Sequence, residues 1–261
     1  MQSSSGAQDF EDHIVRIDFT GQRVLVTGAG HGIGRAIARD YIGAGAAVVG
    51  ADIRDPQDGG AHPADAAIAF VRSDLTVKAE VTRLVGERGP FDILVHSAGG
   101  VCGQTGRPVE EVPEEDWNSI LEINMSAAFW LAQAVAPAMK ARGAGRILMI
   151  ASGAGLGVSL TGIQAYAAAK AGEIGLTRQL AHELGRFGIT VNSIAPGFVR
   201  SNPTTERQWE NYGAEGQAQL IGLIAMRRLG TVADISAAAL FLTSAEASWI
   251  TGQCLPVDGG K

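Results

Sequence analysis

Two residues in the second half of the chain could move a proton. Tyr166 and Lys170 are four positions apart, so on a helix both side chains lie on one face. A phenol with a pKa of about 10 is a poor base at neutral pH, but an adjacent ammonium stabilises the phenolate and lowers that pKa. Tyr166 could then accept a proton from an alcohol. The structural alternative is a half-buried tyrosine covered by the aliphatic stem of the lysine.

A glycine-rich segment near the start of the chain could hold a nucleotide. Residues 27–34 lie between an apolar, β-branched run at 23–27 and a stretch with helical spacing at 33–42. Glycines on such a turn permit positive φ and let backbone N–H groups approach a pyrophosphate, which the positive end of the next helix favours. The glycines that fit are Gly28, Gly32 and Gly34. A tight turn without a ligand is the alternative, but with Tyr166 and Lys170 this segment predicts hydride transfer.

An acidic residue ends the next strand-like run, residues 47–52. Asp52 follows the glycine turn by about 20 residues, where a carboxylate can accept hydrogen bonds from the ribose hydroxyls of adenosine. A carboxylate there also repels a 2′-phosphate, so we expect NAD rather than NADP as cofactor. Arg54 could soften that preference, and Asp52 could instead be a turn residue at the strand end.

The chain resembles the short-chain dehydrogenase/reductase family, in its single-domain branch with a Tyr-x-x-x-Lys motif, from residue 17 to residue 260. The motifs that carry the resemblance are residues 27–34, Ser73-Asp74, Ser97-Ala98-Gly99, Asn124, Ser152, Tyr166 with Lys170, Pro196-Gly197, and Val257-Asp258-Gly259-Gly260.

The resemblance implies a catalytic tetrad of Asn124, Ser152, Tyr166 and Lys170. Tyr166 would be the acid/base, Ser152 would hydrogen-bond the substrate oxygen, and Lys170 would hold the nicotinamide ribose and tune the tyrosine. Asn124 would help to hold a water that relays the proton outward. The expected cofactor residues are Gly28, His31, Gly32, Ile33, Gly34, Asp52, Ile53, Asp74, Leu75, Ser97, Ala98, Gly99, Tyr166, Lys170, Pro196, Gly197, Val199 and Ser201.

Three positions depart from the family pattern. His96 replaces an asparagine that usually ties strands together, so we expect it to be a structural hydrogen-bonding residue. Ser201 stands where a threonine often contacts the nicotinamide amide. Ser152 precedes Tyr166 by one residue more than is common, and Ser159 is the other nearby hydroxyl. Because residues 149–151 have the pattern of a strand that ends at Ser152, we assign the catalytic hydroxyl to Ser152.

Strand-like and helix-like segments alternate, which predicts an α/β fold: one Rossmann-type, doubly wound parallel sheet of about seven strands with helices on both faces. The expected strands are residues 23–27, 47–52, 69–73, 93–96, 146–151, 190–195 and 254–257. We expect residues 17–261 to form one catalytic domain after an N-terminal arm, residues 1–16. Small residues, such as Ala127, Ala128, Ala132, Ala136 and Ala168, lie in expected helices at about 114–141 and 165–186. In this family those helices commonly build a dimer interface within a homotetramer.

The composition limits the partners. The 261 residues carry a formal net charge of −6 and no Lys/Arg run, so binding to nucleic acid or to an anionic membrane is not expected. The two cysteines and five histidines have no metal-ligand spacing. Residues 1–9 lack the apolar core of a signal peptide, and no stretch of about 18 apolar residues occurs. We therefore expect a cytoplasmic protein without a metal.

Residues 198–223 resemble the family's mobile substrate loop, and they are polar. With the polar residues at 104–107 and Gln164, they favour a sugar, polyol or sugar acid over a sterol or a long acyl chain. The substrate candidates are Gln104, Ser159, Gln164, Arg200 and Trp209. One alternative is a 3-oxoacyl-carrier-protein-type reductase, which Asp52 disfavours because such enzymes usually use NADPH. A non-catalytic NAD sensor or scaffold is the other, which the complete tetrad disfavours.

Overall fold

The computed structural model describes residues 17–55 and 62–261. The expected N-terminal arm, residues 1–16, lies outside the described residues. Within the described ranges no helix is long and apolar enough to cross a membrane. No group of three or more His, Cys, Asp or Glu side chains in these ranges could hold a metal ion.

The centre of the fold is one parallel sheet of seven strands, as the sequence predicts. In spatial order the strands are β3 (Ala69–Arg72), β2 (Ala47–Asp52), β1 (Arg23–Thr27), β4 (Ile93–His96), β5 (Gly145–Ile150), β6 (Ile189–Pro196) and β7 (Cys254–Val257). Val24 of β1 pairs with Val48 on one side and Ile93 on the other. The strand order reverses between β1 and β4, which is where open parallel sheets bind ligands.

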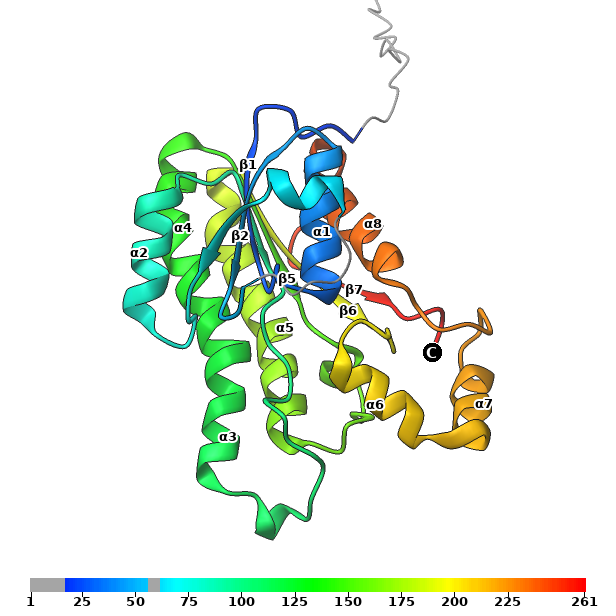
Figure 1. Ribbon diagram of the computed structural model, residues 1–261. Helices are drawn as coiled ribbons and strands as arrows, with labels where there is room; N and C mark the ends of the chain where they lie inside the picture. The colour runs from blue at the N-terminus through cyan, green and yellow to red at the C-terminus, as the bar shows by residue number, and fades with distance from the viewer. Residues whose placement is uncertain (1–16, 56–61) are drawn as a thin grey trace, which may run out of the picture.

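Helices cover both faces of the sheet (Figure 1). One layer contains α1 (Gly32–Gly43) and α8 (Val232–Thr243), and the other contains α2 (Lys78–Arg88), α4 (Ala127–Arg142) and α5 (Gln164–Leu184). Beyond the sheet lie α3 (Glu114–Leu121), α6 (Pro203–Asn211) and α7 (Gly213–Leu223). This two-sided cover confirms the predicted doubly wound architecture.

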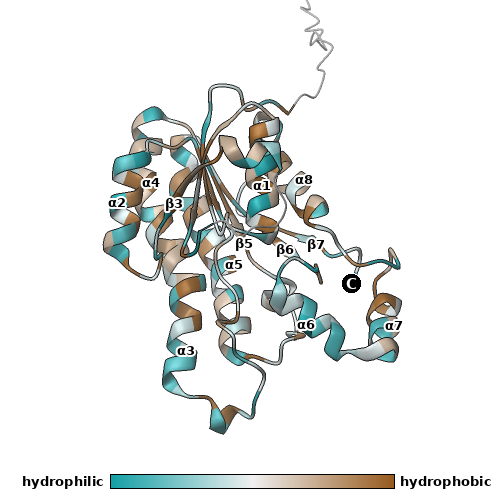
Figure 2. Ribbon diagram, in the orientation of Figure 1, coloured by the Kyte–Doolittle hydropathy of each residue, from teal (hydrophilic) through white to brown (hydrophobic). Residues whose placement is uncertain are grey.

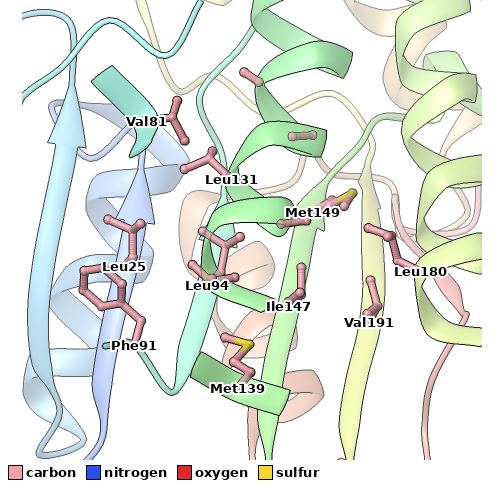
Figure 3. Packing of buried hydrophobic residues seen from close by; sticks show 14 of the residues in the cluster. Leu25, Val81, Phe91, Leu94, Leu131, Met139, Ile147, Met149, Leu180 and Val191 are labelled. Carbon is pink, nitrogen blue, oxygen red and sulfur yellow. The ribbon is translucent and has the colours of Figure 1, made fainter. Parts of the chain in front are cut away.

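The sheet divides the core into two apolar clusters because side chains alternate between its faces. Leu94 and Ile147 point toward α4 and α5 (Figure 3), whereas Val95 and Leu148 point toward α1 and α8. All four side chains are at most 1% exposed. In Figure 2 the strands are accordingly hydrophobic, while α6 is largely hydrophilic. Burial on both faces explains why these strands read as continuous apolar runs.

The expected helix over residues 114–141 is interrupted. Helix α3 ends at Leu121, a π-helical turn follows over Glu122–Ser126, and α4 begins at Ala127. Such single π-turns inside helices are frequent at functional sites, and this one contains Asn124.

Three of the small residues expected at a subunit interface are buried within the chain. The side chains of Ala127, Ala128 and Ala132 are at most 1% exposed and belong to the chain's own core. They permit close packing of α4 on the sheet and are unavailable to another subunit. Ala168 on α5 is exposed.

Candidate active site

The carboxyl edge of the sheet opens into a cleft of about 930 Å³. All eighteen of the expected cofactor residues line it, and so does Ser152. Segments from six different strand ends therefore meet in one place, as the doubly wound topology requires.

The glycine turn between β1 and α1 is held close to the segment after β4. Gly28 has a φ of 68°, and a Cβ built there would lie 2.8 Å from the backbone nitrogen of Ala98. A Cβ on Gly34 would overlap the carbonyl oxygen of Gly28. Glycine at these positions therefore lets the backbone segments pack this closely, and the N-terminus of α1, whose first N–H groups have no partner within the helix, favours a phosphate. The turn therefore fits a dinucleotide.

Asp52 is fixed at the adenosine end of this cradle. Its carboxylate accepts hydrogen bonds from the backbone N–H of Gly30 (3.1 Å) and of Arg54 (3.2 Å), and it is 7% exposed. His31 lies close by, with Nδ1 3.9 Å from Oδ2. Burial lowers the pKa of His31, so at neutral pH its ring leaves the negative charge of Asp52 uncompensated.

The proton-transfer residues approach the cleft from α5 and from the end of β5. Tyr166 and Lys170 lie one turn apart on α5, with Nζ 5.9 Å from the centre of the tyrosine ring. Lys170 is buried, and Nζ donates to the carbonyl of Ile150 at 3.0 Å. The Oγ of Ser152 accepts from the N–H of Ala154 at 3.1 Å, which fixes the hydroxyl at the end of β5. This arrangement brings together three of the four tetrad residues.

The fourth, Asn124, lies behind the cleft and does not line it. Its amide nitrogen donates to the carbonyls of Gly100 (2.9 Å) and Ile120 (2.8 Å), and its oxygen accepts from the N–H of Gly100 (2.9 Å). The side chain thus ties the π-turn to the loop after β4. Its part in a proton relay stays a prediction.

His96 connects this π-turn to β1. Its Nε2 faces the carbonyl oxygen of Asn124 at 3.4 Å, and its Nδ1 lies 3.0 Å from the hydroxyl of Thr27. Because a carbonyl only accepts, the ring proton belongs on Nε2 and the threonine donates to Nδ1. Burial, and next the charge of Lys170, lower the pKa of His96 to about 3, so the ring is neutral. It makes the contacts expected of a structural hydrogen-bonding residue.

Two polar residues of this region were not singled out from the sequence. Thr27 is fully buried at the end of β1, and its hydroxyl also accepts from the N–H groups of Ser97 (3.1 Å) and Ala98 (3.2 Å). Glu173 is fully buried on α5, with its carboxylate against Lys170. The available signal was the position of Glu173, three residues after Lys170 and therefore on the same helix face.

Of the five substrate candidates, only Ser159 lines the cleft. The others make contacts elsewhere: Gln104 donates to the carbonyl of Asp116, Gln164 to that of Arg107, Arg200 pairs with Glu206, and Trp209 packs against Phe198.

An apolar wall, which the sequence reasoning missed, lies in the segment between Ser152 and Tyr166. Leu156, Val158 and Leu160 all line the cleft, and their exposures are 50%, 98% and 45%. They come from the segment that links β5 to α5.

Known proteins share this architecture. The model of the family described as Enoyl-(Acyl carrier protein) reductase matches residues 28–261. This chain belongs to the short-chain dehydrogenase/reductase family. As a family member it is an oxidoreductase that acts on CH–OH groups.

Relatives within the short-chain dehydrogenase/reductase family differ in their substrates. The chain is 36% identical over 251 residues to 3-oxoacyl-(acyl-carrier-protein) reductase FabG of Salmonella typhimurium, covering 94% of this chain and 98% of the relative. It is 37% identical over 261 residues to 7alpha-hydroxysteroid dehydrogenase of Escherichia coli, covering 96% and 97%. A solved structure of a putative 2-deoxy-d-gluconate 3-dehydrogenase from Agrobacterium tumefaciens, with bound NADP, superposes with a TM-score of 0.83 at 34% identity, covering 93% and 97%.

The Thr27 hydroxyl predicts a measurable stability difference. Thr27→Val removes one acceptor and one donor, which leaves the N–H groups of Ser97 and Ala98 and the Nδ1 of His96 unpaired in the interior. Each unpaired buried group costs about 1–3 kcal/mol, so we expect the free energy of unfolding to fall by at least about 2 kcal/mol. Thr27→Ser keeps the hydroxyl and should lose about half as much or less. Urea unfolding at fixed protein concentration measures both, and equal losses would contradict the network.

Proposed function

We propose that this protein is an NAD-dependent dehydrogenase that interconverts an alcohol, a secondary one first, and the corresponding ketone or aldehyde. The observation that carries the proposal is the meeting of Tyr166, Lys170 and Ser152 with the glycine turn and Asp52 in one cleft. The residues of the turn and of the strand ends would hold the dinucleotide, which supplies the hydride acceptor when bound.

The chain's own residues then handle the proton. Ser152 holds the substrate oxygen next to Tyr166, and Tyr166 takes the hydroxyl proton as general base in oxidation or returns it as general acid in reduction. The ammonium of Lys170, 5.9 Å from the ring centre, favours the phenolate form of Tyr166. Because Lys170 is 4% exposed, solvent screens that interaction little.

The role of Tyr166 can be tested by removing its phenol oxygen. Tyr166→Phe removes the acid/base while it keeps the ring, so we expect turnover to fall by roughly 10²–10⁴-fold and the affinity for NAD to stay within about two-fold. Steady-state kinetics and a nucleotide titration measure the two quantities. Tyr212→Phe, on the segment after α6, is the matched control and should retain activity. Full turnover in Tyr166→Phe would exclude this mechanism.

The cofactor preference rests on Asp52. Its carboxylate is held by two backbone N–H groups and has a neutral His31 beside it, which supports recognition of the ribose hydroxyls and repulsion of a 2′-phosphate. The structure of the Agrobacterium relative contains NADP, so the proposed preference for NAD rests on Asp52 and His31 of this chain and not on that relative.

We expect NAD to bind more tightly than NADP, and Asp52→Ala to narrow the difference. The substitution removes ribose hydrogen bonds and charge repulsion, each worth about 1–3 kcal/mol. Titration of both nucleotides against wild type and variant gives the ratio of dissociation constants. Asp55→Ala, three residues on and exposed, is the control. Equal or tighter binding of NADP to the wild type would overturn the assignment.

For the substrate we propose first a sugar, polyol or sugar acid. Polar groups on the cleft wall support it: the hydroxyls of Ser159 and Thr205 and the amides of Asn202 and Gln208 could satisfy several hydroxyl groups. The name of the Agrobacterium relative points the same way.

The second candidate is a 3-oxoacyl or other partly apolar ketone. The specific observation in its favour is the wall of Leu156, Val158 and Leu160, which offers an acyl chain or a ring system an apolar surface beside the catalytic residues. The names of the Salmonella and Escherichia relatives agree with such a surface.

A substrate screen separates the two candidates. With NAD and enzyme at high concentration, polyols, aldoses and sugar acids should produce NADH, while sterols and 3-hydroxyacyl esters should produce little. Val158→Asn then tests the wall: it should leave turnover of a sugar within about three-fold but reduce that of an acyl substrate by roughly ten-fold or more, because it removes apolar contact. Activity confined to acyl or sterol substrates would replace the first candidate with the second.

We retain a cytoplasmic homotetramer as part of the proposal. The exposed small side chain of Ala168 on α5 supports close approach of a second subunit, and Phe129 on α4 is 42% exposed on the outer side of its helix.

A further inference from the structure

Glu173 is an acidic residue whose side chain is fully buried. It lies on α5, one turn beyond Lys170, and its side chain has no exposed surface. Both carboxylate oxygens accept hydrogen bonds from Nζ of Lys170, at 2.9 and 3.1 Å. An apolar residue at this position would pack against the sheet without the cost of burying a charge. The placement therefore calls for a reason beyond packing.

Among the described residues, few titratable groups lie near the pair of Lys170 and Glu173. Burial raises the pKa of Glu173 to about 7, and the charge of Lys170 opposes that rise. From β4 the titratable group that faces Lys170 is His96, which is neutral. From the end of β5 only the backbone carbonyl of Ile150 reaches Nζ. Tyr166 is the remaining ionisable neighbour, on α5 itself.

This geometry limits what the ammonium can do. Lysine has three N–H donors, and those of Lys170 are directed to the Ile150 carbonyl and to the two Glu173 oxygens. The ammonium is thus held in one position beneath Tyr166. The field at the phenol is that of an ion pair and not that of a bare cation.

We propose that Glu173 is a positioning residue of this site: it fixes the Lys170 ammonium beneath Tyr166 and offsets part of the positive charge that the phenol experiences. The inference rests on the proposed roles of Tyr166 and Lys170 in proton transfer. Glu173 would then be a fifth polar residue of the site, beside the tetrad, and it would affect the basicity of the Tyr166 phenol.

The proposal predicts a shift in the titration of Tyr166. Glu173→Gln keeps the size of the side chain and removes its negative charge, so the charge of Lys170 acts on the phenol without compensation. We expect the midpoint of the Tyr166 titration to move toward acid by about one pH unit, because the phenolate no longer has the negative charge of Glu173 nearby. A purely structural role would leave that midpoint unchanged.

The experiment uses the full chain without substrate or cofactor. The chain has three tyrosines, so incorporation of tyrosine labelled with ¹³C at Cζ gives three NMR signals that report each phenol directly. Tyr166→Phe assigns the signal of interest, and burial raises the pKa of Tyr41 far above that of an exposed phenol. Glu183→Gln is the matched control, because Glu183 is an exposed residue on the same helix, paired with Lys140. It should shift nothing.

A shift toward acid in Glu173→Gln, absent from Glu183→Gln, supports the proposal. No shift, a shift toward alkali, or an equal shift in the control overturns it. If circular dichroism shows that Glu173→Gln is unfolded, Glu173→Leu is measured against the same criterion. Failure of both variants to fold assigns Glu173 to folding and also overturns the proposal. Because no turnover is measured, a substrate screen without NADH formation would count against the proposed function alone.

Discussion

The reversal of strand order between β1 and β4 is the constraint on which the rest of the structure depends. Because the chain leaves these two strands toward opposite faces of the sheet, the carboxyl edge between them stays open. There the backbone after β1 passes so close to the segment after β4 that a Cβ on Gly28 would lie 2.8 Å from the nitrogen of Ala98. The Thr27 hydroxyl satisfies the polar groups buried at this crossing. The wall of the cleft is thus held by a hydrogen-bond network that centres on the buried Thr27 hydroxyl.

Two buried carboxylates, Asp52 and Glu173, lie at different places beside this cleft. Asp52 lies at the glycine turn, where backbone N–H groups hold it and where we propose that its charge faces the adenosine of the dinucleotide. Glu173 lies on α5, where its charge faces the ammonium of Lys170. In our proposals the first carboxylate acts on which nucleotide binds and the second on how readily Tyr166 exchanges a proton. Both side chains are less than a tenth exposed, so solvent screens their charges little.

The sequence predicted the scaffold well because apolar runs and glycine turns are local signals. Four of the seven strands have the expected bounds; β3 differs by one residue at one end, and β5 and β6 differ by one residue at each end. The π-turn over Glu122–Ser126 was not predictable, because the hydrogen bonds that the Asn124 side chain makes to Gly100 come from a distant part of the chain. The pairing of Glu173 with Lys170 was also missed. A helical spacing shows that two residues share a face but not that the face is buried.

The polarity of a segment does not by itself show which of its side chains face a cleft. Residues 198–223 are polar, but they fold into α6 and α7, and many of their polar side chains bind one another: Arg200 pairs with Glu206, Asn202 caps α6 through Thr205, and Gln208 donates to Tyr212. Groups paired in this way keep only part of their hydrogen-bonding capacity for a ligand. The apolar surface of the cleft comes instead from Leu156, Val158 and Leu160, in the short link between Ser152 and Tyr166. Since that link joins two residues proposed to act in catalysis, a substituent that it contacts would also help to set the distance of the reacting carbon from Tyr166. On the proposed mechanism, apolar contacts in this link therefore affect catalytic alignment for a partly apolar substrate, whereas a sugar that makes few such contacts depends on them little.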